Sequence, residues 1–303
     1  MKKTILIFGV SSFVGSNMLE SLKDDFRIIG TYFKTPVSSP GITCLPCDVL
    51  KKDYVSSLVG RFRPDFILYA VGISSLQKCH QQPHQAEALN SAGVVNCCSA
   101  SDRYNSKFIY LSSAFVLGGE KTLYREQETP FPESTYGNTL STTEFYVQRS
   151  SLNFLILRCP VLYGRSYNSL RENWFDSLQS AFAKGESVGV NDSVHLGFLD
   201  VKLMAKILQA IIAKDVSNRL LHVSSKDIMT RYEFAKLYAK VFKKNQSQIQ
   251  KVSSQFPRDK KLSSSENNVL YFQLDTSGLE QFLQEKMPSV EESLNYTYKR
   301  LSL

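Results

Sequence analysis

The sequence lacks any apolar run approaching the roughly 20 residues that a transmembrane helix needs. Its start, "MKKTILIFGV", carries a lysine pair and an apolar run like those of a secretion signal. The run breaks at Gly9 and continues into "SSFVG" without a small-residue cleavage site. We therefore interpret this segment as a buried first strand, and we expect a cytoplasmic protein with no membrane partner.

The sequence also has few residues of the kinds that bind metals. It contains six cysteines and only four histidines, namely His80, His84, His195 and His222. None of these histidines is spaced as a ligand relative to acids or cysteines, so we predict no metal site. The pair in "CLPC" has a redox-like spacing, but no second CxxC accompanies it. We interpret all six cysteines as reduced structural thiols.

The excess of positive charge is modest, because 36 Lys and Arg against 28 Asp and Glu give a net charge of +8. Many of the cations lie between residues 236 and 261. Nucleic-acid binding would need a known module or interleaved aromatic residues, and neither is found, so we predict no nucleic-acid partner. Two interpretations stay open for this segment: a solvated face, or attraction of a small anionic substrate such as a diphosphate-bearing sugar.

What the sequence does contain is a regular succession of apolar runs and helical patterns. With 303 residues, 43% of them hydrophobic, the chain can bury a large core. Because the apolar runs are continuous rather than alternating, they indicate a parallel sheet covered on both faces. The pattern therefore predicts an α/β protein with a doubly wound parallel sheet. The strands are expected at 4–10, 26–33, 66–72, 107–113 and 154–164, with a weaker one at 42–49, and helices at 14–25, 51–62 and 84–104.

This regularity loosens after about residue 165. We predict a first domain at 1–165, to which 198–214 returns, and a smaller C-terminal substrate lobe at 166–303. This lobe should close over the carboxyl edge of the sheet. Helices are expected at 173–185, 199–215 and 230–244, a short strand at 219–225 and an exposed loop at 258–268.

The first strand-to-helix turn, "GVSSFVG", predicts a dinucleotide site. Gly9 permits a tight turn, and Gly15 lets the helix pack closely on the strand and present its N–H groups to a pyrophosphate. Ser12 stands where a middle glycine is usual. The position of this loop at the first junction of a βαβ array strengthens the prediction.

The end of the second strand favours NADP over NAD. The segment "GTYFKT" has no acid to bind the adenosine ribose, and Lys34 suits a 2′-phosphate, although a strand-end lysine can also be merely solvated. Asp48, after the third strand, has two open interpretations. It accepts a hydrogen bond from the adenine amino group, or it caps the following helix.

The order of these motifs resembles that of an extended short-chain dehydrogenase/reductase. The segments are "GVSSFVG", "CDV", "RPDFILYAVG", "CHQQPHQAEALNSAG", "FIYLSSAFVLGG", "ETPFPESTYGNT", "LRCPVLYG" and "HVSSKDIMTRYEFA". Within that class the chain is most similar to the dTDP-4-dehydrorhamnose reductase family. The likeness extends to "FQLDTSGLEQFL" and "PSVEESL" near the C-terminus, so it spans nearly the whole chain.

This resemblance implies a Rossmann-like sheet, a nicotinamide cofactor and a sugar nucleotide held by the C-terminal lobe. It implies catalytic roles for Ser113 and Tyr136, of which Ser113 also meets the substrate and Tyr136 the cofactor. It assigns the cofactor contacts as follows: Ser12, Phe13 and Val14 at the pyrophosphate, Asp48 and Val49 at the adenine, Ala70, Val71 and Gly72 along the inner face, and Asn90 near the active site.

The chain departs from this family one helical turn after the tyrosine. The usual lysine holds the nicotinamide ribose and lowers the tyrosine pKa, and Leu140 can do neither. Since a nearby cation commonly lowers a tyrosine pKa of about 10 by about 1–3 units, Tyr136 should stay protonated at neutral pH. Oxidation or dehydration, which needs tyrosinate, should suffer more than reduction.

Other features bear on the substrate. Ala114 and Val161 stand where the family has an acid and a tryptophan, so specific contacts to the sugar are missing. The literal YxxxK from Tyr232 to Lys236 lies in a C-terminal helix, and we reject it as the catalytic pair. Arg158 is either structural or faces the substrate.

We derive three hypotheses for the function. The first is an NAD(P)-dependent reductase of a keto group on a nucleotide-linked sugar, slowed by the missing lysine. The second is a non-catalytic dinucleotide-binding regulatory subunit, since the regulatory subunit of methionine adenosyltransferase resembles the same family. The third is a nucleotide-sugar epimerase or dehydratase, which the tyrosinate requirement disfavours. A homo-oligomer is compatible with each of them.

Overall fold

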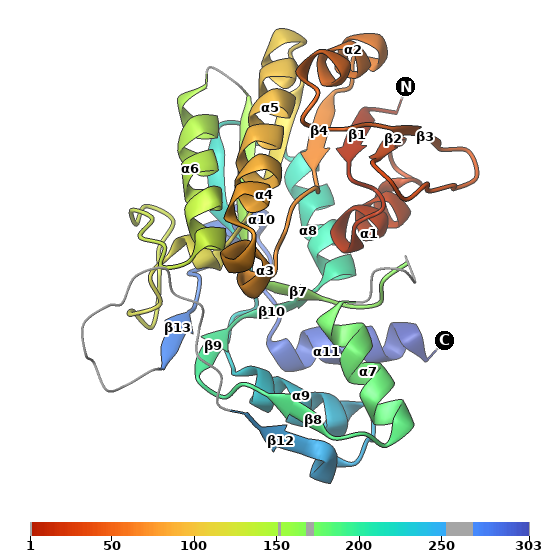
Figure 1. The fold of residues 1–303 in the computed structure, drawn as a ribbon. Helices are drawn as coiled ribbons and strands as arrows, with labels where there is room; N and C mark the ends of the chain where they lie inside the picture. The colour runs from red at the N-terminus through yellow and green to blue at the C-terminus, as the bar shows by residue number, and fades with distance from the viewer. Residues whose placement is uncertain (1, 151–152, 168–172, 253–268, 303) are drawn as a thin grey trace.

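The computed structural model describes residues 2–150, 153–167, 173–252 and 269–302 (Figure 1). The exposed loop expected at 258–268 lies outside the described residues. No helix within the described residues is long and apolar enough to span a bilayer.

A seven-stranded sheet forms the centre of the larger part of the molecule (Figure 1). Its strands are β1 (Thr4–Phe8), β2 (Arg27–Tyr32), β3 (Thr43–Pro46), β4 (Phe66–Tyr69), β5 (Lys107–Ser113), β6 (Phe154–Cys159) and β11 (Arg219–His222). Their order is β11-β6-β5-β4-β1-β2-β3, and every neighbouring pair is parallel. The chain order reverses at β1, which lies between β2 and β4, and ligands of such sheets bind beyond the strand ends at this point. The predicted doubly wound α/β fold is confirmed.

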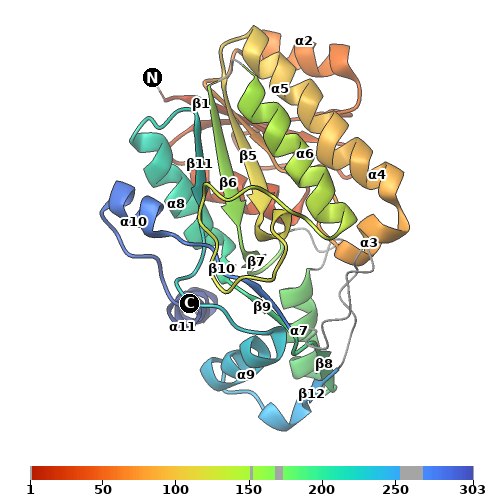
Figure 2. The same cartoon turned by 90° about the vertical axis from the view of Figure 1, so that its left-hand side faces the viewer.

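Helices cover both faces of this sheet (Figure 2). Helix α1 (Phe13–Leu22) packs against α8 (Val201–Ala213) on one face, and α2 (Lys52–Phe62), α5 (Gly93–Arg103) and α6 (Thr135–Arg149) form the layer on the other. Alternate strand residues therefore enter two separate cores, which explains why the strands read as continuous apolar runs. The chain returns to these layers after residue 165 with α8 and β11. The domain boundary at 165 stays a prediction.

The helix expected at 84–104 is present but irregular. It consists of α4 (Pro83–Glu87), a π-helical turn at Ala88–Ala92 and α5, and it follows the short α3 (Leu76–Gln81). Such π turns widen a helix locally and occur often at functional sites. This turn carries Asn90, whose contacts are described below.

The strand expected at 154–164 divides at Pro160. Before the proline the chain lies in the sheet as β6, and after it β7 (Val161–Tyr163) pairs with β10 (Phe198–Asp200) instead. Proline has no N–H to donate to a sheet ladder, which accounts for the break. The second sheet pair thus begins directly at the carboxyl end of β6, where the smaller lobe adjoins the larger part.

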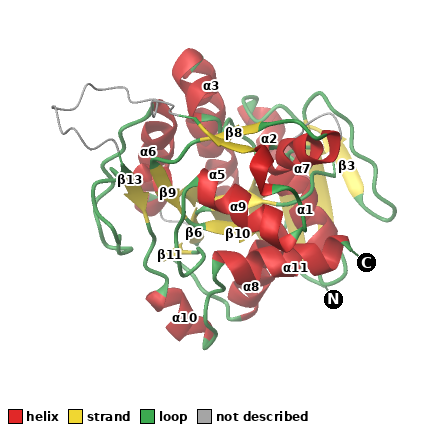
Figure 3. Cartoon of the chain, turned by 90° about the horizontal axis from the view of Figure 1, so that it is seen from below, coloured by secondary structure: helices red, strands yellow, loops and turns green. Residues whose placement is uncertain are grey.

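The smaller lobe consists of short strand pairs and helices (Figures 1 and 3). Both further strand pairs are parallel: β8 (Val188–Val190) with β12 (Ile249–Lys251), and β9 (Val194–Leu196) with β13 (Leu270–Phe272). Besides α8, the described part of the chain after residue 165 forms α7 (Trp174–Lys184), α9 (Arg231–Val241), α10 (Ser277–Leu283) and α11 (Val290–Leu301), of which α10 packs against β11 of the large sheet.

Candidate functional site

The loop between β1 and α1 is packed too tightly for side chains at its two glycines. Gly9 has φ +91°, and a Cβ there would lie 2.8 Å from the Ala70 carbonyl oxygen. A Cβ at Gly15 would lie 2.2 Å from the carbonyl oxygen of Gly9. The loop therefore requires both glycines, and the backbone stays close to the end of β4.

The serine in the middle of this loop begins the helix. The Ser12 side chain accepts a hydrogen bond from the Gly15 N–H at 2.9 Å and acts as the N-cap of α1. The following N–H groups, at Phe13 and Val14, precede the intrahelical ladder and are available to an anion. The loop thus stays tight and leaves the N-terminus of α1 open although the middle glycine is replaced.

Aromatic side chains surround the expected adenine position. A surface hollow is lined by Phe33, Pro46, Cys47, Asp48 and Tyr54, at the ends of β2 and β3. The Lys34 ammonium lies 5.5 Å from the centre of the Phe33 ring.

The interpretation of Asp48 as the cap of the following helix is wrong, because the N-cap of α2 is Lys51 and none of the described side chains caps this helix. Asp48 Oδ1 accepts a hydrogen bond from the Leu50 N–H at 3.0 Å, which stabilises the turn before α2. Its side chain also lines the hollow, so it is in place to meet a ligand. The neighbouring Val49 is buried, with 4% of its surface exposed.

Asn90 joins the loop after β4 to helix α6. Its Oδ1 accepts from the Ile73 N–H at 2.8 Å, and its Nδ2 donates to the Ile73 carbonyl and to the Thr139 hydroxyl at 3.1 and 3.2 Å. A Cβ at Gly72 would lie 2.6 Å from Asn90 Oδ1, so the loop needs a glycine there. Asn90 therefore holds the segment containing Ala70, Val71 and Gly72 beside the helix that carries Tyr136.

The structure brings Ser113 and Tyr136 together. Ser113 ends β5, Tyr136 lies in the first turn of α6, and the Ser113 hydroxyl is near enough to influence the acidity of the Tyr136 phenol. The Phe115 ring packs edge-on against Tyr136 at 6.2 Å. Helix α6 comes this close because residue 137 is glycine: a Cβ there would lie 2.1 Å from the Phe115 carbonyl oxygen.

Burial controls the acidity of this tyrosine. It raises the pKa of Tyr136 well above the ordinary value, and the nearby Ser113 hydroxyl offsets only part of the effect. The phenol is consequently protonated at neutral pH, as expected from the missing lysine.

Leu140, one turn after Tyr136, is buried in the core with 5% of its surface exposed. One turn further, Glu144 forms a buried ion pair with Arg158 of β6, with 2.7 Å between Glu144 Oε2 and the guanidinium. Each of these two side chains is 1% exposed. Ser112 also donates a hydrogen bond to Glu144, at 2.5 Å. Arg158 is therefore a structural residue that holds α6 on the sheet.

Sequence reasoning missed Glu144 and Phe115. A signal for Glu144 exists, since it lies eight residues after Tyr136 on the same helical face as Leu140. A carboxylate on an otherwise core-facing stripe requires a cationic partner, and the arginine inside the apolar run of β6 is the natural candidate.

The expected substrate residues follow the ends of β5 and β6. Ala114 begins the 3₁₀ turn Ala114–Val116 and is 2% exposed. Val161 is the first residue of β7, and its N–H donates to the Gly197 carbonyl at 3.0 Å. Neither side chain offers a polar group to a sugar.

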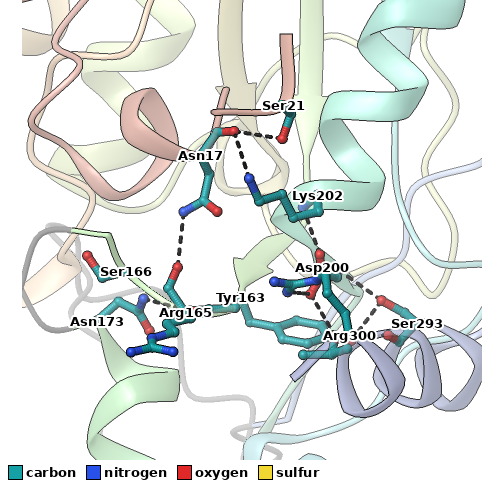
Figure 4. A network of polar contacts seen from close by, with 12 residues as sticks. Asn17, Ser21, Tyr163, Arg165, Ser166, Asn173, Asp200, Lys202, Ser293 and Arg300 are labelled. Atoms are coloured by element: carbon teal, nitrogen blue, oxygen red, sulfur yellow. Dashed lines mark hydrogen bonds and ion pairs between the residues drawn. The ribbon is translucent and has the colours of Figure 1, made fainter. Parts of the chain in front are cut away.

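A polar network ties the smaller lobe to the sheet layers (Figure 4). Asn17 of α1 donates to the Arg165 carbonyl after β7 at 3.1 Å, and its own carbonyl accepts from Lys202 of α8 at 3.4 Å. Asp200, fully buried at the start of α8, pairs with Arg300 of α11 at 2.9 Å. These contacts fix where the lobe lies relative to α1 and the β1–α1 loop.

The parallel sheet with its crossover at β1, the glycine loop and the adjacent serine and tyrosine define an extended short-chain dehydrogenase/reductase fold. The family model described as RmlD substrate binding domain matches residues 1–302, so the chain belongs to the RmlD substrate binding domain family. The resemblance expected from the sequence is confirmed.

Relatives include both enzymes and a subunit. Methionine adenosyltransferase 2 subunit beta of Xenopus laevis is 24% identical over 259 residues, which cover 82% of this chain and 75% of that protein. The dTDP-4-dehydrorhamnose reductase of Aggregatibacter actinomycetemcomitans is 23% identical over 190 residues, covering 62% and 65%. Among solved structures, dTDP-4-dehydrorhamnose reductase of Bacillus anthracis in complex with NADP has a TM-score of 0.84 at 21% identity, with 99% and 100% of the chains covered.

Proposed function

We propose that the protein is an NADPH-dependent reductase of a keto group on a nucleotide-linked sugar, slowed by the absence of the lysine. The observation that carries the proposal is the neighbouring pair of Ser113 and a protonated Tyr136 at the carboxyl edge of the sheet. Such a pair can polarise a carbonyl and supply its proton.

The residues of the crevice fit a nicotinamide dinucleotide. Gly9 and Gly15 let the backbone approach a pyrophosphate, and the N-terminus of α1 offers N–H groups to it. The lack of an acid after β2, together with Lys34, supports NADP over NAD. The Bacillus anthracis relative was crystallised with NADP, and WbmH of Bordetella bronchiseptica, another structural neighbour, with NAD⁺.

The chain's own residues have separate roles in the proposed reaction. When bound, the reduced nicotinamide supplies the hydride. Ser113 donates a hydrogen bond to the substrate carbonyl oxygen, and Tyr136 transfers its proton to that oxygen as the alkoxide forms. The proton on Tyr136 is then replaced from solvent. Leu140 leaves the cofactor ribose without an ammonium partner, so cofactor affinity and rate are both reduced.

The proposal includes a cytoplasmic location, which the free state of all six cysteines supports.

The test is oxidation of NADPH under single-turnover conditions, with dTDP-4-dehydrorhamnose and other nucleotide-linked keto sugars. We expect slow oxidation with at least one sugar. Tyr136→Phe, which keeps the ring but has no proton to give, should reduce the rate about 100-fold or more. Equal rates for wild type and Tyr136→Phe would contradict the assigned role.

A non-catalytic regulatory subunit is the second candidate. Burial of Leu140 in the core and the likeness to methionine adenosyltransferase 2 subunit beta favour it. In this case NADPH should raise the melting temperature, but no sugar should cause its oxidation. Oxidation that depends on Tyr136 would exclude this candidate.

A further inference from the structure

Buried hydroxyl groups join helix α6 to the π turn at Ala88–Ala92. Ser91 lies within this turn, and Thr143 lies in α6 two helical turns after Tyr136. Both residues are buried, with 6% and 1% of their surfaces exposed. Because a hydroxyl without a hydrogen bond is costly to bury, the bonds that these two side chains make determine whether the contact is stable.

Each hydroxyl reaches a backbone carbonyl of the opposite element. Ser91 Oγ donates to the Thr139 carbonyl of α6 at 3.0 Å. Thr143 Oγ1 lies 3.0 Å from the Asn90 carbonyl oxygen of the π turn and 2.8 Å from the Thr139 carbonyl oxygen of its own helix. We call Ser91 and Thr143 the hydroxyl clamp, because together they bond the two elements in both directions.

The hydroxyl clamp acts on residues that adjoin the candidate site. The Thr139 hydroxyl donates to the Tyr136 carbonyl at 2.8 Å and accepts from Asn90 Nδ2 at 3.2 Å. Asn90 in turn binds both backbone groups of Ile73, in the loop after β4. The clamp therefore joins the helical turn that carries Tyr136 to the loop that lines the expected cofactor crevice.

The π turn makes this connection depend on side chains. A π turn interrupts the regular ladder of a helix, so its position is set less by its own backbone and more by its neighbours. At residue 140, where a long side chain of α6 could extend toward the crevice, the chain has a buried leucine. Buried hydroxyl bonds hold α6 against the π turn instead.

We propose that Ser91 and Thr143 are positioning residues for Tyr136, a role that rests on the proposed reductase activity. By holding α6 on the π turn, they keep the phenol at the distance and angle from which its proton can be transferred. Proton transfer requires hydrogen-bond reach, so a displacement of about 1 Å can lower a rate about 100-fold.

The test measures NADPH oxidation by Thr143→Val, in which the side chain keeps its shape and loses its hydroxyl. With the nucleotide-linked keto sugars that the wild type reduces, kcat should fall about tenfold or more while KM changes less than about twofold. Thr143→Ser keeps the hydroxyl and should retain about half of the wild-type kcat or more. Thr142→Val, at the exposed neighbouring position, is the matched control and should not change kcat.

Ser91→Ala removes the other half of the clamp and serves if the valine variant does not fold. It should reduce kcat about fivefold, as expected for the loss of one buried hydrogen bond. A purely structural role would lower the melting temperature of both variants and leave kcat of the folded protein unchanged, and this result would overturn the proposal.

Hydrogen exchange distinguishes a failure of the clamp from a failure of the reductase. In Thr143→Val the Ile73 N–H, which donates to Asn90 Oδ1, should exchange about tenfold faster than in wild type or in Thr143→Ser. Equal exchange in all three proteins would overturn the clamp whatever the activity. Faster exchange in the valine variant, with no NADPH oxidation by the wild type, would support the clamp and contradict only the reductase.

Discussion

At the scale of single residues, the acidity of Tyr136 determines which chemistry the site can support. Burial raises its pKa, and the position one turn later carries no cation. Reduction uses the protonated phenol, so its rate should not vary with pH between about 6 and 9. A base reaction would need tyrosinate, which is scarce in this range.

Leu140→Lys should restore the missing cation. The lysine stem can replace the leucine in the core while its ammonium extends toward the crevice. We expect NADPH oxidation to accelerate about tenfold or more, and the tyrosine pKa to fall by about 1–3 units. Rates are measured from pH 6 to 9 beside Leu140→Met, which fills the same space without charge and should give no gain. No acceleration with any keto sugar would argue against a latent reductase site.

His222 should make stability depend on pH. It is fully buried, and burial together with the Arg158 charge lowers its pKa to about 3. In the unfolded chain a histidine has a pKa of about 6.5, so it takes up a proton at a higher pH than His222 does in the folded protein. The free energy of unfolding is therefore largest above about pH 6.5 and decreases as the pH falls toward 3. The loss should be up to about 1.4 kcal/mol per pH unit.

Urea unfolding at pH 7.5 and pH 5 measures this dependence. His222→Gln should remove about 2 kcal/mol of the difference between the two pH values, and the exposed His84→Gln should remove none. Equal pH dependence in wild type and His222→Gln would show that other groups cause it.

At the scale of elements, α6 depends on the buried pair that joins it to β6. Arg158→Met should reduce the free energy of unfolding by about 3–5 kcal/mol, because Glu144 is left buried and unpaired. The double variant Arg158→Met, Glu144→Leu should recover most of this loss, since an apolar pair needs no counter-charge. Urea unfolding of both variants checks the prediction, and a double variant as unstable as the single one would contradict it.

The elements were predictable where local pattern determines them. The strands that are buried on both faces were predicted from their continuous apolar runs. The loop between β1 and α1 was predicted from the spacing of its two glycines. The break at Pro160 was not predicted, because the residues on both sides of it are equally apolar. The π turn around Asn90 has no local signature. The ion pair of Glu144 and Arg158 depends on residues that meet only in the folded chain.

At the scale of the whole molecule, the smaller lobe must keep its place over the sheet edge. Asp200 and Arg300 link the start of α8 to α11 (Figure 4). Arg300→Met should reduce stability by about 1–3 kcal/mol and increase hydrogen exchange along α11, because Asp200 stays buried with fewer partners. The neighbouring Lys299→Met is exposed and should change neither quantity. Protection of α11 equal to that of wild type would show that apolar packing alone holds the lobe.

The buried position of Leu140 also affects how this protein can change over time. At an open crevice position a lysine could be introduced at little cost. Here the leucine fills core volume beside packed neighbours, and a lysine must place its charged end close to that core. Packing therefore opposes a cation beside Tyr136, and with it any change of this site toward base chemistry.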